Sequence, residues 1–133
     1  MTLGVRAIAL DADGRVFLVR HTYLPGFHLP GGGVESNETA LASLERELHE
    51  EGRIALGEPL RLIGFFYNPR HSRRDHVALY VATNVRQTAA RPPDWEIAEC
   101  GFYPLDALPA KTTPSTRARL DEFFNGATPD PIW

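Results

Sequence analysis

Apolar residues gather in short runs along this chain, and polar turn residues separate the runs, a pattern that predicts β-strands. Residues Val5 to Leu10 and Arg15 to Arg20 are two such runs, and Asp11 to Gly14 between them is typical of a hairpin turn. Leu60 to Tyr67 and His76 to Thr83 are rich in apolar and aromatic residues and are also predicted strands. The first part of the chain is therefore expected to form a hairpin, and the middle part to add further strands.

A helical period replaces this pattern from about Thr39 to Glu51. We expect Ser36 or Asn37 to cap the start of this helix. A second helix is predicted from Ser115 to Phe124, with Gly126 as its stop. Strands interrupted by one helix and closed by another favour an α/β fold in layers.

Two arcs of side chains lie next to each other on the first helix. At about 100° per residue, three leucines share one arc and three glutamates share the neighbouring one. The residues are Leu41, Leu44 and Leu48, and Glu47, Glu50 and Glu51. Glutamates near a helix C-terminus oppose the helix dipole, and at this spacing they repel one another. They are costly unless a cation lies among them, and oxygen ligands suit Mg²⁺ or Mn²⁺. The alternative is a solvated acidic face.

The glycine turn Gly31–Gly33 precedes this helix, and the spacing of the two resembles the Nudix box of the Nudix hydrolase family. The matching positions are Gly32, Glu38, Arg46, Glu47, Leu48, Glu50, Glu51 and Ile54. One position departs from the motif, because Arg53 stands where the family has glycine and Gly52 lies one residue earlier. Since that glycine would be the left-handed cap of the helix, we expect Gly52 to end it one residue sooner.

The resemblance implies an α/β/α sandwich in which helices flank a mixed central sheet. It also implies an Mg²⁺ or Mn²⁺ site formed by Glu47, Glu50 and Glu51 with the backbone carbonyl of Gly31. Gly32 and Glu38 would have structural roles in the box, with Glu38 pairing with Arg46 or bracing the helix.

Further catalytic roles follow from the same resemblance. Arg46 would orient a catalytic carboxylate. Either Glu47 or Glu99 would take the proton from the attacking water. Glu96 and Asp94 are alternatives to Glu99, because all three lie in the segment that follows the central sheet.

The loop between the two central strands holds the only dense basic cluster, Arg70, Arg73 and Arg74. A guanidinium group can donate two parallel hydrogen bonds to a phosphate group, so this loop is a candidate phosphate clamp. The alternative is an exposed loop that charge keeps soluble. We also assign Arg20 and His28 to substrate binding.

Composition narrows the class of protein. The 133 residues are expected to form one domain, 1–133, and the net charge of −3 argues against a general nucleic-acid or anionic-membrane binder. The single cysteine, Cys100, fits a reducing compartment, and no run of residues has the pattern of a membrane span or signal peptide. We therefore expect a cytoplasmic protein whose partner is a small nucleotide. Homodimers are common in the family that it resembles.

The resemblance supplies the expected reaction, the hydrolysis of the pyrophosphate bond of a nucleoside diphosphate linked to another moiety. One alternative is a non-catalytic module of the same fold that senses a nucleotide. Another is a hydrolase that removes damaged nucleoside triphosphates from the nucleotide pool.

Overall fold

The computed structural model describes residues 2–133. Strands come first, one helix interrupts them, and a second helix follows the last strand. The elements are β1 (Thr2–Ala9), β2 (Val16–His21), β3 (Phe27–His28), β4 (Gly31–Gly33), α1 (Ala40–Gly52), β5 (Ile54–Ala55), β6 (Arg61–Tyr67), β7 (Asp75–Ala82), β8 (Arg86–Gln87), β9 (Ile97–Tyr103) and α2 (Pro114–Asn125). The predicted central strands are confirmed as β6 and β7. Neither helix of residues 2–133 has the length and hydrophobicity needed to cross a lipid bilayer.

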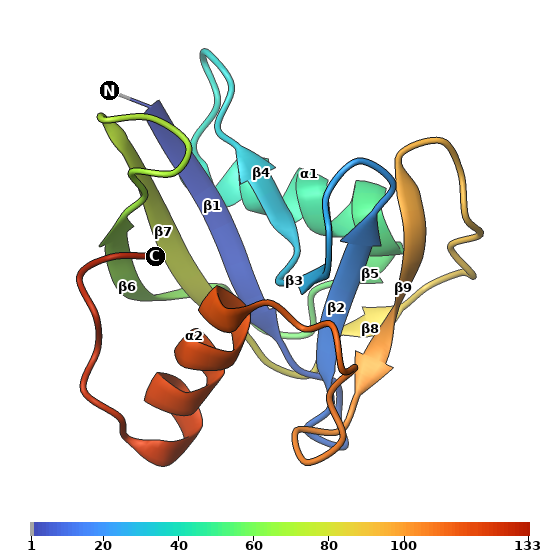
Figure 1. The fold of residues 1–133 in the computed structure, drawn as a ribbon. Coiled ribbons are helices and arrows are strands. Elements are labelled where there is room, and N and C mark those ends of the chain that lie inside the picture. The colour runs from blue at the N-terminus through green and yellow to red at the C-terminus, as the bar shows by residue number, and fades with distance from the viewer. Residues whose placement is uncertain (1) are drawn as a thin grey trace.

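The strands form two main sheets. The larger has the order β4-β1-β7-β6, with β1 and β7 parallel and the other pairs antiparallel, so it is a mixed sheet. The smaller is the antiparallel sheet β3-β2-β9, and β5 pairs separately with β8. Figure 1 shows α1 behind β1 and β4, and α2 in front of the sheets.

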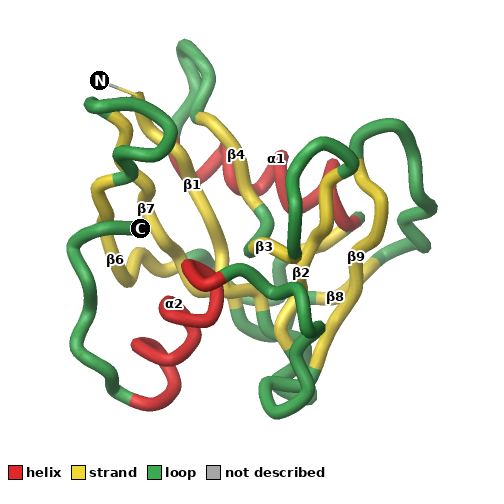
Figure 2. Tube along the Cα trace, viewed as in Figure 1, coloured by secondary structure: helices red, strands yellow, loops and turns green. Residues whose placement is uncertain are grey.

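Alternate residues of the strands pack against the two helices (Figures 1 and 2). Val5 of β1 and Phe17 of β2 share a buried cluster with Leu44 and Leu48 of α1. The neighbouring side chains along both strands join a second buried cluster, which includes Leu120 of α2. Because successive strand residues point to opposite faces, one apolar strand fills two cores. The predicted α/β class, a mixed sheet flanked by helices, is confirmed.

The predicted hairpin between the first two strands is wrong. The turn itself forms, with the Asp11 carboxylate accepting hydrogen bonds from the amides of Asp13 and Arg15 at 3.0 and 2.9 Å. Beyond it, however, only Leu10 and Val16 bridge the two strands. The strands then diverge into different sheets, because β1 pairs with β7 and β2 pairs with β9.

The start of α1 also differs from the prediction. Thr39, rather than Ser36 or Asn37, is the N-cap, and its hydroxyl accepts a 3.1 Å hydrogen bond from the amide of Ala42. Asn37 instead has a positive φ of 63°, so it belongs to the loop that leads from the glycine turn. The second helix agrees with the prediction, since α2 ends at Gly126 with a φ of 70°.

The expected cap at Gly52 is wrong as well. Gly52 is the last residue of α1, and Arg53 itself takes the left-handed conformation, with φ 56° and ψ 37°. A Cβ atom on Gly52 would collide with the ring of Phe17 in β2. Glycine is therefore needed at position 52 for packing, which leaves the left-handed cap to an arginine.

Candidate active site

The glycine turn lets backbone and carboxylates approach each other closely. Strand β4 pairs with β1, so that Gly31 lies opposite Arg6 and Gly32 opposite Val5. Gly31 has a φ of 149°, and a Cβ atom there would collide with the carbonyl oxygen of Val5. A Cβ atom on Gly32 would lie 2.5 Å from Oε1 of Glu47. A side chain at Gly31 would therefore push the turn away from β1, and a side chain at Gly32 would push it away from α1.

Glu51 is the buried carboxyl group of this site, with only 4% of the residue exposed. Its Oε1 accepts a 2.7 Å hydrogen bond from the amide of Gly31. Burial raises the pKa of Glu51 to about 8, although the positive charge of Arg6 and the hydrogen bond from Gly31 act in the opposite direction. A protein that buries such a group pays for its desolvation unless a cation compensates for the charge.

His21, at the end of β2, contacts the other oxygen of this carboxyl group. Its Nε2 lies 3.3 Å from Oε2 of Glu51, and both side chains are almost fully buried. Burial, Arg6 and His28 together lower the pKa of His21 to about 4, so the imidazole is neutral near pH 7. Its Nδ1 has no hydrogen-bond partner within residues 2–133. The contact of His21 with Glu51 was not predicted from the sequence.

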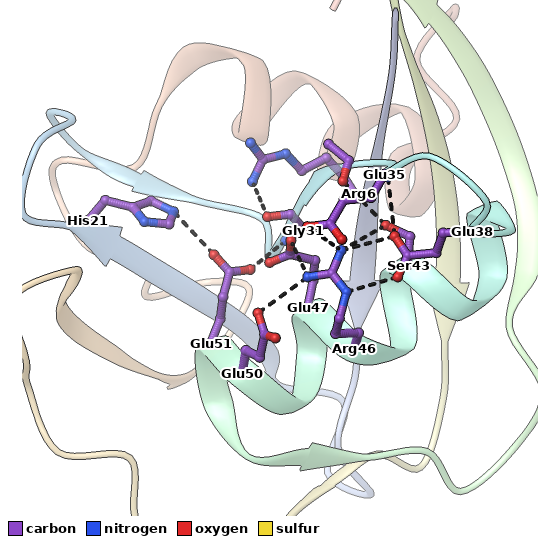
Figure 3. Close-up of polar contacts among 11 residues, drawn as sticks. Arg6, His21, Gly31, Glu35, Glu38, Ser43, Arg46, Glu47, Glu50 and Glu51 are labelled. Atoms are coloured by element: carbon purple, nitrogen blue, oxygen red, sulfur yellow. Dashed lines mark hydrogen bonds and ion pairs between the residues drawn. The ribbon is translucent and has the colours of Figure 1, made fainter.

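Arg46 contacts three other box residues, Glu38, Glu47 and Glu50 (Figure 3). Its Nε and Nη2 donate to the two oxygens of Glu38 at 2.9 and 3.0 Å. Its Nη1 lies 3.1 Å from Oε1 of Glu47 and 3.3 Å from Oε2 of Glu50. This geometry holds the loop before α1 against the helix. The expected pairing of Glu38 with Arg46 is confirmed. Arg46 also contacts Glu47, and its role in orienting a catalytic carboxylate stays a prediction.

The three predicted metal ligands occupy different surroundings. The pKa of Glu47 is raised mainly by burial, against the nearby positive charge of Arg46. The Glu50 side chain is 57% exposed and points to Arg46, whereas Glu51 points to Gly31 and His21. As they lie, no three His, Cys, Asp or Glu side chains in residues 2–133 are grouped so as to hold a metal ion. The ligand set stays a prediction.

Arg6 is a second residue that sequence reasoning missed. Its Nη1 donates to the carbonyl oxygens of Leu29 and Gly31, at 2.9 and 3.4 Å. The signal was present, because an arginine interrupts the otherwise apolar run of β1. Arg6 lowers the pKa values of both His21 and Glu51, and so it supplies positive charge beside the acidic groups.

The acids of the segment before and within β9 are not equally placed. Oε1 of Glu99 lies 3.3 Å from Nη2 of Arg20, on the strand that pairs with β9. Asp94 accepts hydrogen bonds from the amides of Glu96 and Ile97. The charge of Glu96, by contrast, contributes to the raised pKa of Glu51. Glu99 as a base therefore stays a prediction, and the structure pairs it with Arg20.

The remaining predicted substrate residues lie in two separate parts of the structure, on β3 and on the β6–β7 loop. The Nε2 of His28 lies 3.0 Å from the carbonyl oxygen of Pro25, and burial lowers the pKa of His28. Arg70, Arg73 and Arg74 are exposed on the β6–β7 loop, beside the start of β1 (Figure 1). Their role in substrate binding stays a prediction.

The site is thus a glycine turn packed on a helix that carries partly and fully buried carboxyl groups, in a mixed α/β fold. Residues 1–123 match the family model of the NUDIX domain. The chain belongs to the Nudix family, and it is a hydrolase that acts on pyrophosphate bonds. Members of this family generally use a divalent metal ion and act on small nucleotides.

Individual relatives support this assignment. A Bacillus subtilis (strain 168) protein named "Putative 8-oxo-dGTP diphosphatase" is 26% identical over 126 residues, which cover 95% of this chain and 82% of that protein. An RNA pyrophosphohydrolase of Xylella fastidiosa (strain 9a5c) is 38% identical over 60 residues, which cover 45% of this chain but only 31% of that protein. The crystal structure of a MutT NUDIX hydrolase from Burkholderia pseudomallei has a TM-score of 0.74 and 28% identity, covering 90% of this chain and 95% of that one.

Proposed function

We propose that this enzyme is an Mg²⁺- or Mn²⁺-dependent hydrolase of the pyrophosphate bond in a nucleoside diphosphate linked to another moiety. One observation carries the proposal. The carboxyl groups of Glu47 and Glu51, one helical turn apart, both lie against the backbone of the glycine turn. This arrangement is costly for the folded protein and useful for binding a cation next to a phosphate group.

The side chains present fit such an ion. Glu47, Glu50, Glu51 and the carbonyl of Gly31 offer only oxygen atoms, the donors that Mg²⁺ and Mn²⁺ prefer. Burial raises the pKa values of Glu47 and Glu51 by more than the positive charges of Arg46 and Arg6 lower them, so both sites favour an added cation. When bound, the ion neutralises pyrophosphate oxygens and lowers the pKa of a water molecule. These four groups would hold it.

Other residues of the chain would position the reacting groups. Glu47 is the better supported base, because its carboxyl group lies against the glycine turn, whereas the side chain of Glu99 is half exposed on β9 and contacts Arg20 of β2. Arg46 would keep Glu47 in place through its contact at 3.1 Å, while Glu38 anchors Arg46. His21 would hold Glu51 from the opposite side. The proton of the attacking water would then pass to Glu47.

A second candidate is the hydrolysis of damaged nucleoside triphosphates. It is favoured by the name of the Bacillus subtilis relative and by the likeness to a MutT NUDIX hydrolase. A non-catalytic nucleotide sensor is less favoured, because all three glutamates of the box are present in a chain of a hydrolase family. We further propose that the enzyme acts in the cytoplasm on small nucleotides, in keeping with its acidic net charge and single cysteine.

A nucleotide panel tests the two enzymatic candidates together. Each compound is incubated with Mg²⁺, with Mn²⁺ or with EDTA, and the enzyme is then removed by ultrafiltration. Excess Mg²⁺ and Zn²⁺ are added to every filtrate together with alkaline phosphatase or inorganic pyrophosphatase, and the released phosphate is measured. Hydrolysis of a linked diphosphate gives monophosphates, which only the first coupling detects. Hydrolysis of a triphosphate to its monophosphate gives pyrophosphate, which the second detects. Turnover that is equal with EDTA would contradict the metal-dependent mechanism.

A further inference from the structure

Arg6 reaches the glycine turn from the face of the larger sheet opposite α1. Its neighbours Val5 and Ala7 pack on the α1 side, so the Arg6 side chain leaves β1 on the other side. It then passes over Gly31, its partner in β4, where a Cβ atom would lie only 2.9 Å from the Cα and Cδ atoms of Arg6. Glycine at position 31 therefore admits a guanidinium group to the edge of the turn.

The guanidinium group contacts two backbone carbonyls there. Its Nη1 donates to the carbonyl oxygen of Leu29 at 2.9 Å and lies 3.4 Å from that of Gly31. The first is a good hydrogen bond, whereas the second is longer than the usual limit of about 3.2 Å. Gly31 is thus contacted by two charged residues (Figure 3), since its amide donates to Glu51 and its carbonyl accepts from Arg6. The contact of Arg6 with the Gly31 carbonyl is the weaker one and the easier to exchange.

The Gly31 carbonyl is also one of the four groups that the proposed function assigns to the divalent ion. Arg6 and an ion at this oxygen would lie next to each other, and like charges at such a separation repel. Burial raises the pKa values of Glu51 and Glu47, and the positive charge of Arg6 acts against this in both. Arg6 therefore already supplies part of the positive charge that an ion would bring to these acids.

No ion pair holds Arg6 in this position. Within residues 2–133 its guanidinium group forms no salt bridge, and its Nε and Nη2 donate to no acceptor. Neither of these two nitrogen atoms is buried, and the residue is half-buried. Arg46, by comparison, is bound to Glu38 through two nitrogen atoms. Arg6 is therefore the arginine of the site that can change partners at little cost.

Arg6 borders a cavity of about 470 Å³ that also reaches the glycine turn. Its lining includes Arg6, Gly32 and Gly33, with Asn68 and His71 of the β6–β7 loop. Gly32 is the residue against which the carboxyl group of Glu47 packs. A diphosphate group at this end of the cavity would meet both Arg6 and an ion at the turn. Guanidinium groups donate paired hydrogen bonds to phosphate, so Arg6 would find stronger acceptors there than the Gly31 carbonyl.

We propose that Arg6 is the internal counter-ion of the site and that it couples binding of the divalent ion to binding of the diphosphate. With Arg6 at the Gly31 carbonyl, the free enzyme binds the ion weakly. A diphosphate draws the guanidinium group onto its own oxygens and adds negative charge, so the ion then binds tightly. Each ligand strengthens the binding of the other by the same factor. The inference rests on the proposed function for the positions of the ion and the diphosphate.

Binding of Mn²⁺ to the free enzyme tests the competition without turnover. Arg6→Gln removes the charge and keeps an N–H donor, whereas Arg6→Lys keeps the charge. We expect Arg6→Gln to bind Mn²⁺ roughly tenfold more tightly than the wild type, and Arg6→Lys to bind it as weakly as the wild type. Calorimetric titration of metal-stripped protein measures these affinities. Binding to Arg6→Gln that is no tighter than to the wild type would overturn the inference.

Arg61→Gln is the matched control. Arg61 is exposed at the start of β6 and forms no ion pair within residues 2–133, so its replacement changes the net charge equally without touching the glycine turn. It should leave the affinity for Mn²⁺ unchanged. A gain as large as that of Arg6→Gln would assign the effect to net charge and would refute the role of Arg6. Arg6→Met, which keeps an unbranched side chain, replaces Arg6→Gln if the latter does not fold.

The other half of the coupling is measured with methylenediphosphonate, a diphosphate analogue that resists hydrolysis and carries no nucleoside. It is titrated against each protein in metal-stripped buffer. We expect Arg6→Gln to bind it roughly tenfold more weakly than the wild type, and Arg61→Gln to bind it equally well. One substitution thus has opposite effects on two ligands, whereas a damaged fold would weaken both. Weaker binding of both ligands, or unchanged binding of the analogue, would contradict the coupling.

Hydrolysis separates failure of this inference from failure of the proposed function. With a substrate from the nucleotide panel and saturating Mg²⁺, Arg6→Gln should raise KM by more than it lowers kcat, because the ligands of the ion are intact. If no compound of the panel is hydrolysed but Arg6→Gln shows the two opposite shifts in affinity, the proposed function fails and the role of Arg6 stands. If a substrate is found and Arg6→Gln binds Mn²⁺ no more tightly than the wild type, the inference fails and the proposed function stands.

Discussion

The carboxyl group of Glu51 accepts a 2.7 Å hydrogen bond from the backbone amide of Gly31, a residue twenty positions earlier in the chain. This contact ties the end of α1 to the turn that precedes it. It also holds an acid in a buried position, where its pKa rises to about 8. The site is therefore built to hold a carboxyl group that a cation can ionise.

Replacing this acid should separate catalysis from folding. Glu51→Gln is close to isosteric, and the buried carboxyl group is already largely protonated at pH 7 because of its raised pKa. We expect metal-stimulated kcat to fall by roughly 100-fold or more, since even outer partners of a metal site are worth 10–100-fold. The melting temperature should change by only a few degrees. Steady-state kinetics and thermal unfolding measure the two quantities.

Glu45→Gln is the matched control for that variant. Glu45 is an exposed glutamate of the same helix, and it forms no ion pair within residues 2–133. Its replacement should leave both kcat and the melting temperature unchanged. Wild-type turnover in Glu51→Gln would remove Glu51 from the metal site.

The pH dependence of stability should reveal the same group. A carboxyl group whose pKa is raised from 4.5 to about 8 in the folded state keeps its proton there, while the unfolded chain loses it. The folded state binds more protons between these pH values, so the metal-free protein should lose stability as the pH rises from 4.5 towards 8. Magnesium ions should raise the melting temperature more at pH 8 than at pH 6.

The loss of stability with rising pH and the larger stabilisation by Mg²⁺ at pH 8 both depend on the ionisation of Glu51. In Glu51→Gln, both pH dependences should therefore become smaller. The measurement is a set of thermal unfolding curves at constant ionic strength, with EDTA or with Mg²⁺. An identical stabilisation by Mg²⁺ at both pH values in the wild-type protein would show that ionisation of Glu51 is not linked to binding of the ion.

The ion pair between Arg46 and Glu38 should have the opposite pH dependence, because its contribution to stability is lost as the pH falls. The hydrogen bonds from Arg46 lower the pKa of Glu38 to about 2. A lowered pKa in the folded state contributes stability above the unfolded value of 4.5, and the contribution is lost as the pH falls from 4.5 towards 2. Glu38→Gln should therefore reduce the difference in stability between pH 5 and pH 2.5. Urea unfolding at the two pH values checks this, and an unchanged difference would show that the pair adds nothing.

The conformation at the end of α1 leads to a prediction about the free energy of unfolding. Arg53 is in the left-handed conformation, which costs a residue with a Cβ atom about 1 kcal/mol, so Arg53→Gly should raise the free energy of unfolding by roughly that amount. Gly52→Ala should lower it by about 1–3 kcal/mol, because the added methyl group meets the ring of Phe17. Denaturant unfolding measures both. Two changes of the same sign would contradict the interpretation that position 52 is set by packing and position 53 by the cap.

The box could be predicted from the sequence because its geometry is local. The resemblance to the Nudix box implies that Glu38, in the loop before the helix, pairs with Arg46, and the structure shows Arg46 in contact with Glu38 and Glu47. Helix α2 was predicted for the same reason, with its stop at Gly126. Helical periodicity depends only on residues a few positions apart.

His21 and Arg6 could not be assigned in the same way. His21 belongs to β2 and Arg6 to β1, and both reach Glu51 or the glycine turn only because these strands enter different sheets. The sequence instead indicated a hairpin, since the turn Asp11–Gly14 forms in either arrangement. Whether β1 and β2 form a hairpin or enter different sheets depends on the distant strands with which they pair, β7 and β9.

The sequence by itself determined the class of enzyme through its resemblance to the Nudix box. It also determined the acidic arc of α1 and the glycine turn in front of it, because these follow from side-chain identity and the fixed period of a helix. The tertiary structure alone decided that Glu51 is buried against Gly31 and His21, that Gly52 packs on Phe17, and that the arginine loop borders a cavity beside β1. The physical reason is that burial and long-range strand pairing are properties of the whole core, which short segments of sequence do not specify.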